Sequence, residues 1–236
     1  DMYHLIGHTN ESLVYYLKAL ELCPSENYYQ VAYSSVGMGN IYFHEFFNNE
    51  QALESYQKAL EMKLKYLDET NTEIIDLYDT IGGSLEYILF KQTGEIVHHR
   101  NASINLEQAV KISANYSLQE DPQFILVFRM LGDLNYHTNN DLTALNYYQK
   151  GIDCENRAQR PFDEFCMKEI PDLYLYAGLL YHRLDNIDLA FQCWNKVSQY
   201  ISDCSIYSNI YQKLQMVFDE ASHLHALKYK KQVTFF

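Results

Sequence analysis

One helical segment recurs six times along this chain, and this recurrence restricts the possible folds more than any other feature of the sequence. Each copy starts with a small residue and carries an aromatic or aliphatic residue four positions later. The copies are Ser12-LVYYLKAL, Ala52-LESYQKAL, Ala102-SINLEQAV, Ala144-LNYYQKGI, Ala190-FQCWNKVS and Ala226-LKYKKQVT. Positions separated by four and seven residues share one face of an α-helix, so every copy is predicted to present a packing seam.

A partner segment precedes several copies by 12 or 13 positions. Gly39, Gly132 and Ala177 supply the small residues of the partner segments, and two helices approach closely only where side chains are small. The chain is therefore predicted to be a single all-α array of five to six antiparallel helix pairs over residues 1–236. Its second helices are predicted to start near residues 12, 52, 102, 144, 190 and 226.

The predicted turns contain residues that tolerate left-handed backbone and cap the following helix, at 48–49, 139–141 and 185–188. Prolines are expected between helices, and this expectation covers Pro24, Pro122, Pro161 and Pro171. The second pair is the least regular, because Gly82 and Gly83 are adjacent. Residues 91–101 are predicted to form a long connection in that pair, with His98 and His99 in a solvated loop.

The two ends of the sequence match parts of the repeat. Residues 1–4 align with the last half of a partner helix, and residues 226–236 stop within a second helix. A helical array normally carries polar capping elements at both ends. We therefore expect the chain to be part of a longer polypeptide, in which truncated ends could also support self-association.

Composition and motifs exclude several classes of function. The 31 acidic and 18 basic residues give a formal charge of -13, which disfavours nucleic acid and anionic membranes as partners. The five cysteines include no C-x-x-C pair, and the nine histidines form no H-E-x-x-H motif. Nucleophile-elbow and phosphate-binding motifs are also absent from the sequence. We expect a cytoplasmic protein that is not an enzyme and needs no metal or cofactor.

The stretch LGDLNYHTNNDLTALNYYQKGI, residues 131–152, resembles the tetratricopeptide-repeat family closely. Repeat spacings near 42 residues and the elongated helix that starts at Ala52 resemble the kinesin-light-chain-like subgroup more weakly. Membership of this family implies a right-handed superhelical solenoid. Its concave groove would be lined by the first helix of each pair.

The phase of the first helices predicts which residues face such a groove. The peptide-binding candidates are Asn40, Phe43, His44, Tyr87, Arg129, Asp133, Tyr136, His137, Tyr176, His182, Arg183 and Tyr211. The wider set adds Val36, Gly37, Asp79, Glu86, Met130, Leu175, Gln212 and Gln215. Each candidate could also be an ordinary packed or solvated helix residue. Asn40 and Asp133 could bond an extended peptide backbone, because each directly follows a small anchor residue.

Two functional hypotheses follow. In the first, the chain binds a peptide or partner protein in the groove, and its negative charge favours neutral or basic partners. Arg129 and Arg183 could form a local basic spot that clamps a carboxylate. In the alternative, the array is a regulatory or targeting domain of a larger multidomain enzyme such as a transferase.

Overall fold

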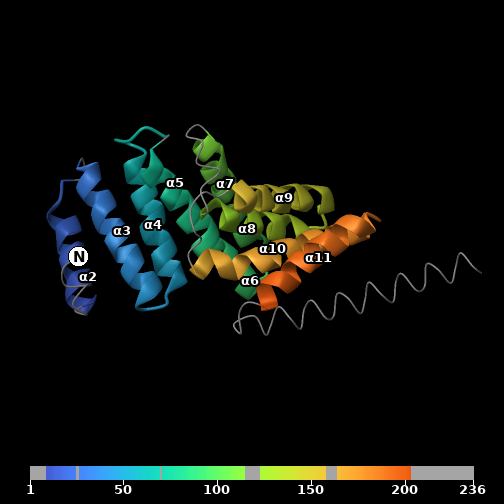
Figure 1. The fold of residues 1–236 in the computed structure, drawn as a ribbon. Helices are drawn as coiled ribbons and strands as arrows, with labels where there is room; N and C mark the ends of the chain where they lie inside the picture. Colours follow the sequence, from blue (N-terminus) through green and yellow to red (C-terminus); the bar gives the residue numbers. More distant parts are fainter. Residues whose placement is uncertain (1–8, 25–26, 70, 115–122, 158–163, 203–236) are drawn as a thin grey trace, which may run out of the picture. The chain divides into compact units, whose positions relative to one another are not determined.

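A computed structural model describes residues 9–24, 27–69, 71–114, 123–157 and 164–202 of the chain. Throughout these described ranges the regular elements are helices, and no β-strand occurs (Figure 1). The all-α architecture predicted from the recurring segment is therefore confirmed. The chain divides into two compact units, unit 1 (residues 1–119) and unit 2 (residues 120–236).

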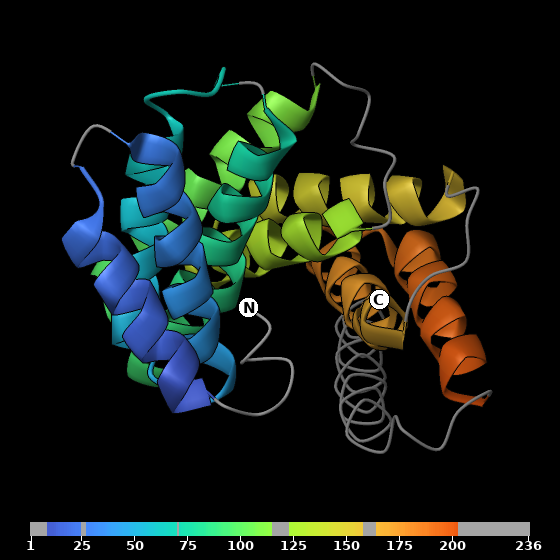
Figure 2. The same cartoon turned by 90° about the vertical axis from the view of Figure 1, so that its left-hand side faces the viewer.

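Unit 1 contains two helix pairs and the second helix of a further repeat. Its elements are α2 (Thr9–Leu22), α3 (Tyr28–His44), α4 (Asn49–Lys63), α5 (Thr72–Asp79), η1 (Thr80–Tyr87), α6 (Ile88–Thr93) and α7 (Ile96–Ser113). Helix α3 packs between α2 and α4 (Figure 1, Figure 2). Helices α5, η1 and α6 run on from one another, and all three pack against α7.

The second pair differs from its prediction in two respects. The segment η1 is a π-helix, and Gly82 within it lies so close to Leu106 of α7 that a side chain there would crowd the backbone. The predicted connection over residues 91–101 is wrong, because α6 ends at Thr93 and α7 already begins at Ile96. Gly94, with φ of 72°, supplies the left-handed residue that allows this short turn.

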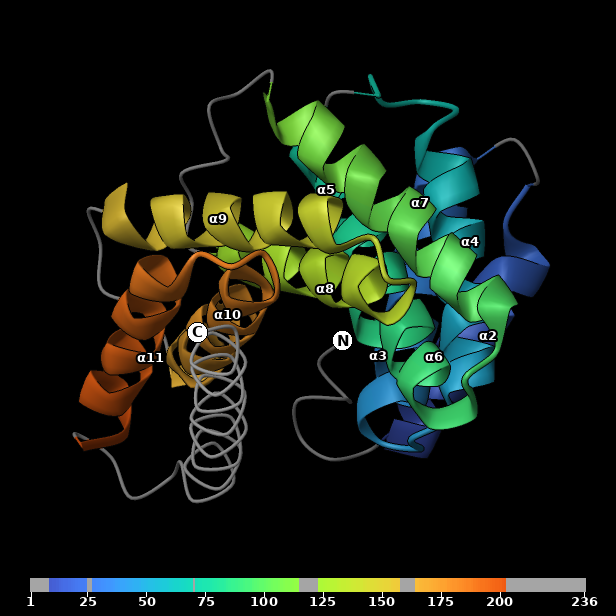
Figure 3. The ribbon, with the colours of Figure 1, turned by 90° about the vertical axis from the view of Figure 1, so that its right-hand side faces the viewer.

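Unit 2 consists of two helix pairs. Its helices are α8 (Gln123–His137), α9 (Asp141–Arg157), α10 (Glu164–Arg183) and α11 (Ile187–Ser202). Figure 3 shows α8 beside α9 and α10 beside α11, and α10 also packs against both helices of the preceding pair. Pro171 lies inside α10, so the expectation that it would fall between helices is wrong. Pro122 and Pro161 lie outside the described residues.

The pairs are closed by similar tight turns. Asn139 and Asp185 have positive φ values of 57° and 65°, as their predicted turn role requires. Asn48 caps α4, since its Oδ1 accepts a 3.0 Å hydrogen bond from the Gln51 amide. The left-handed position of this first turn is nevertheless Phe47, with φ of 51°, rather than an asparagine.

The core follows the recurring segment. Its small starting residues Ala52, Ala102, Ala144 and Ala190 are all completely buried. The residues four positions later are buried as well, and they are Tyr16, Tyr56, Leu106, Tyr148 and Trp194. These burials confirm the predicted packing seam in the five described copies, whereas the copy at Ala226 lies outside the described residues.

Candidate functional site

In the α3/α4, α8/α9 and α10/α11 pairs, a glycine of the first helix lies beneath an aromatic ring of the second helix. In the α3/α4 pair, Gly39 packs against the Tyr56 ring so closely that a Cβ would clash with it. The next residue, Asn40, accepts a 2.5 Å hydrogen bond through its Oδ1 from the Tyr56 hydroxyl. Burial raises the pKa of Tyr56 to about 12, so this hydroxyl remains a donor at neutral pH.

The α8/α9 pair repeats the same arrangement with a charged acceptor. Gly132 packs against the Tyr148 ring, and the Tyr148 hydroxyl donates a 2.7 Å hydrogen bond to Oδ1 of Asp133. The other carboxylate oxygen, Oδ2, lies 2.6 Å from Nη1 of Arg129. Asn40 and Asp133 are therefore bonded within their own repeats. Asp133 is only 6% exposed, so a bond from it to a peptide backbone would compete with these contacts. Asn40 is exposed, and its role toward a peptide stays a prediction.

Arg129 is held between two carboxylates rather than forming a basic spot. Besides Asp133, its Nε lies 2.8 Å from Oε2 of Glu169 on α10. Only 12% of the Arg129 side chain is exposed, so both ion pairs are shielded from water and from screening by salt. The two carboxylates together carry more charge than the single guanidinium group that they hold.

An aromatic and guanidinium cluster lies on the first helices of unit 2. Arg183 stacks above the Tyr136 ring, with the guanidinium carbon 4.7 Å from the ring centroid, and its Nη2 donates a 2.7 Å hydrogen bond to the Tyr136 hydroxyl. Tyr136 in turn packs against Tyr176 of α10, with ring centroids 5.4 Å apart. Arg183 also pairs with Asp141 at 3.3 Å, although 45% of its side chain stays exposed. We name Tyr136, Tyr176 and Arg183 the α8/α10 cluster.

Tyr176 connects this cluster to the core. Its ring stacks on Tyr148 at a centroid distance of 6.0 Å and an interplanar angle of 14°. Burial, followed by the charge of Asp133, raises the pKa of Tyr176 to about 12. The partly exposed Tyr176 is thus a neutral aromatic surface supported by a rigid buried ring.

Of the remaining predicted residues, His137 contacts the α8/α10 cluster, since its ring lies edge-on to Tyr136 with ring centroids 6.2 Å apart. Phe43 and His44 lie together in the last turn of α3, with ring centroids 4.8 Å apart. His137 is exposed at the end of α8. His182 packs against the buried Trp194, with ring centroids 5.8 Å apart. Tyr87 differs from its prediction, because it is only 7% exposed and belongs to the core. Tyr211 lies outside the described residues.

A buried carboxylate in unit 1 was only partly anticipated. Glu86 of η1 is 1% exposed, and its two oxygens contact His98 Nδ1 at 2.6 Å and Asn101 Nδ2 at 2.9 Å. The predicted loop position of His98 is therefore wrong, since it lies on α7 and holds Glu86. His98 and Asn101 are three positions apart and so share one face of a helix, which was the available signal, but the misplaced start of that helix concealed it.

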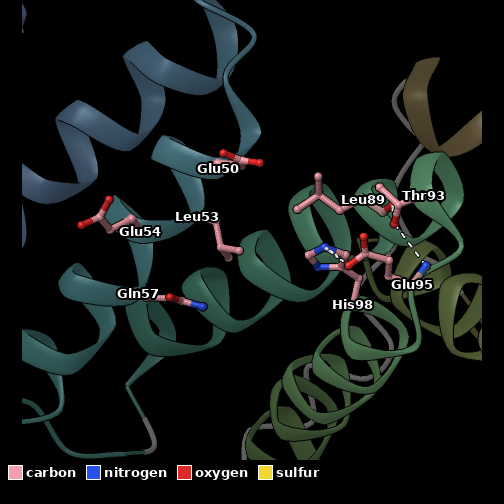
Figure 4. A pocket seen from close by; sticks show the side chains of 8 residues that line it. All are labelled: Glu50, Leu53, Glu54, Gln57, Leu89, Thr93, Glu95 and His98. Carbon is pink, nitrogen blue, oxygen red and sulfur yellow. Dashed lines mark hydrogen bonds and ion pairs between the residues drawn. The ribbon is translucent and has the colours of Figure 1, made fainter.

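Two pockets flank α4 in unit 1, and neither was predicted from the sequence. The larger one, about 300 Å³, is lined by Glu50, Leu53, Glu54, Gln57, Leu89, Thr93, Glu95 and His98 (Figure 4). The smaller one, about 140 Å³, is lined by Leu20, Ser35, Met38, Tyr42, Gln51, Glu54, Ser55 and Lys58. Glu54 lines both pockets.

Metal binding and membrane insertion find no support within the described ranges. There, no three His, Cys, Asp or Glu side chains converge in a way that could hold a metal ion. Across the same ranges, no helix has the length and apolar character needed to cross a bilayer. Cys154 and Cys193 are buried thiols, and burial raises the pKa of Cys193 to about 11.

Comparison with known proteins identifies the fold. No protein-family model and no curated protein sequence matches the chain. Among solved structures, BtubC (BKLC) from P. vanneervenii is similar over 86% of this chain and 77% of its own, with a TM-score of 0.65 and 14% identity. YrrB, described as a TPR protein with an unusual peptide-binding site, is similar over 92% of this chain and 87% of its own, with a TM-score of 0.59 and 16% identity.

A putative kinesin light chain from Podosopora anserina, described as having TPR-like repeats, is similar as well. The similarity covers 87% of this chain and 92% of that one, with a TM-score of 0.59 and 13% identity. The chain thus has the fold of the tetratricopeptide-repeat superfamily, as the sequence predicted. At these identities the likeness describes the fold, and it leaves the kinesin-light-chain-like subgroup as a prediction.

Proposed function

We propose that this chain is a protein-interaction module that binds an extended peptide segment of a partner protein on the first helices of its repeats. The observation that carries this proposal is the α8/α10 cluster, where Tyr136, Tyr176 and Arg183 meet at a partly exposed surface. Tyrosine and arginine are the residue types that most often dominate the binding energy of protein interfaces. Their rings and guanidinium group are already ordered by mutual contacts, which lowers the entropic cost of binding.

The charges around the cluster favour a neutral or basic peptide. Arg129 faces two carboxylates, and Arg183 faces one, so neither arginine brings uncompensated positive charge to the surface. The chain as a whole carries a formal charge of -13. Acidic peptides would meet repulsion during approach and would have to displace existing ion pairs.

The similar structures support the general class of function. YrrB is described as having a peptide-binding site, and its fold extends over most of this chain. In unit 1, the exposed Asn40 and His44 and the partly exposed Phe43 occupy the end of the first helix α3, and we propose this turn as a separate peptide contact of that unit. The buried Tyr87 is excluded from it.

The test is binding of a peptide selected from a displayed library against the whole chain. Replacing Tyr136 or Arg183 by alanine should weaken the affinity for the selected peptide by about 5- to 30-fold, as for residues at the centre of an interface. Tyr147→Ala is the matched control, since this tyrosine lies on the second helix α9 and also packs against a cation, Lys150. Fluorescence anisotropy measures the affinities. Equal weakening by all three variants would contradict the proposed surface.

A further inference from the structure

A surface around α4 in unit 1 carries two pockets whose lining residues are not among those of the proposed peptide site. Its larger pocket lies between α4 and the junction of α6 with α7 (Figure 4), and its smaller pocket lies where α2, α3 and α4 meet. Because Glu54 lines both, the two pockets are neighbours on either side of one helix. A single extended segment crossing α4 could therefore enter both of them.

The larger pocket combines negative charge with apolar walls. Glu50 and Glu54 of α4 and Glu95 before α7 supply carboxylates, and no lysine or arginine is among its lining residues. Figure 4 shows Leu53 and Leu89 contributed from the two sides of the opening. A lysine or arginine side chain has an apolar stem and a cationic head, so it complements such a pocket in both respects. At about 300 Å³ the pocket has room for one side chain of this size.

The smaller pocket contains a buried polar group without a partner. Ser35 is 1% exposed, and among the described residues nothing accepts from or donates to its Oγ. The other serine of the pocket, Ser55, is satisfied, because its hydroxyl donates a 2.7 Å hydrogen bond to the Gln51 carbonyl. A buried hydroxyl group without a hydrogen bond is unfavourable, so Ser35 is ready to bond a polar group that enters the pocket.

We propose that this surface binds an extended peptide segment in which a basic residue stands beside a small polar residue. The basic side chain occupies the larger pocket near Glu50 and Glu95, and the polar neighbour bonds Ser35 in the smaller pocket. This site goes beyond the function proposed above, because its lining residues differ from those of the α8/α10 cluster and from Asn40, Phe43 and His44. It would stand even if the α8/α10 cluster bound nothing.

The test is a titration of the isotope-labelled whole chain with short capped peptides, followed by nuclear magnetic resonance. The probe is acetyl-Ser-Lys-Ser-amide. In the first control peptide norleucine replaces lysine, which keeps the stem and removes the charge. In the second, alanine replaces both serines. The lysine probe should shift resonances of α4 and of the first turn of α7, and these shifts should saturate. The norleucine peptide should produce no saturable shifts at these positions.

Three variants separate the parts of the proposal. Glu50→Gln combined with Glu95→Gln should weaken the affinity for the lysine probe by about fivefold or more at low salt, since both carboxylates would pair with the lysine ammonium group. The control Glu107→Gln combined with Glu61→Gln removes the same charge from exposed positions outside both pockets. Ser35→Ala should reduce the affinity for the serine-containing probe until it equals the affinity for the alanine peptide. The same variant should leave the affinity for the alanine peptide unchanged.

Several results would overturn the proposal. Equal weakening by the two charge-removing double variants would show that only the overall field attracts the peptide. Saturable binding of the norleucine peptide with equal affinity would show that the carboxylates do not select a cation. Shifts confined to Tyr136 and Tyr176 would show that basic peptides bind the α8/α10 cluster instead. If Ser35→Ala preserved the preference for serine, the smaller pocket would hold water and no ligand group.

Discussion

The hydroxyl group of Tyr148 donates a hydrogen bond of 2.7 Å to the carboxylate of Asp133, and this bond joins the two helices of one repeat inside its core. Tyr56 and Asn40 form the corresponding bond in the α3/α4 pair, at the same offset from the packing seam. The tyrosine four positions after the small residue therefore has two roles. Its ring fills the space above a glycine, and its hydroxyl fixes the polar residue that follows this glycine.

Tyr148→Phe should destabilise the fold more than Tyr56→Phe. The first change removes a donor from a buried carboxylate and should cost about 1 to 3 kcal/mol, whereas Asn40 is exposed and water can replace the lost donor there. Urea denaturation followed by circular dichroism measures both free energies of unfolding. Equal losses would mean that the Asp133 carboxylate does not depend on this hydroxyl.

Ala59→Trp should destabilise the fold by about 1 to 3 kcal/mol, because overpacking a filled seam forces neighbouring side chains out of their positions. Ala59 is completely buried seven residues after Ala52, and its cluster includes Leu77 and Ile81 of the next first helix. Glu54→Trp, on the exposed face of the same helix, is the control and should change the melting temperature little. Matching melting temperatures would refute the helical phase.

The sequence predicted the second helices well because their burial pattern depends on local spacing. Small residues and rings recur at fixed intervals, and the structure buries both sets. The site was predicted less well, because its contacts join residues far apart in sequence. The pairing of Arg129 with Glu169 spans two helix pairs. Likewise, the π-helical turns around Gly82 and Gly83 change which residues face α7, and no fixed 3.6-residue phase could place Tyr87 or Glu86 correctly.

Phe47→Asn should stabilise the fold by about 0.5 to 1 kcal/mol, because residues other than glycine, asparagine and aspartate are strained at positive φ. Phe47 holds φ at 51° and is 82% exposed, so the change removes little packing. The equivalent turn positions are Asn139 and Asp185. Asn139→Phe is the reciprocal variant and should destabilise by a similar amount. Thermal unfolding of both variants measures the effect, and a loss of stability in Phe47→Asn would assign a contact to the exposed ring.

Asp79 should make stability depend on pH in the neutral range. Burial and the nearby charge of Asp76 raise the pKa of Asp79 to about 7, whereas an unfolded aspartate titrates near 3.9. Between these values the folded state keeps a proton that the unfolded state has lost. The stabilisation is therefore complete below about pH 4 and disappears as the pH rises through about 7.

Asp79→Asn removes this titration and provides the measurement. One proton changes the free energy of unfolding by about 1.4 kcal/mol per pH unit, and partial contact of Asp79 with solvent reduces the range over which this slope applies. The free-energy difference between the native sequence and the variant should therefore fall by about 1 to 2 kcal/mol from pH 5 to pH 8. The exposed Asp188→Asn serves as control. A difference independent of pH would show that Asp79 is ionised throughout.

The charge of preferred peptides can be tested through one ion pair near the α8/α10 cluster. We expect a peptide array to show stronger binding of neutral and basic sequences than of acidic ones, with the contrast fading at higher salt. Glu169→Gln should then strengthen the binding of acidic peptides. Arg129 loses one of its two carboxylate partners in this variant and can pair with a carboxylate of the peptide instead. Glu107→Gln changes the net charge equally but lies in unit 1. If acidic peptides bound best to the native chain, and both variants changed the affinity for acidic peptides equally, the selection by local charge would be refuted.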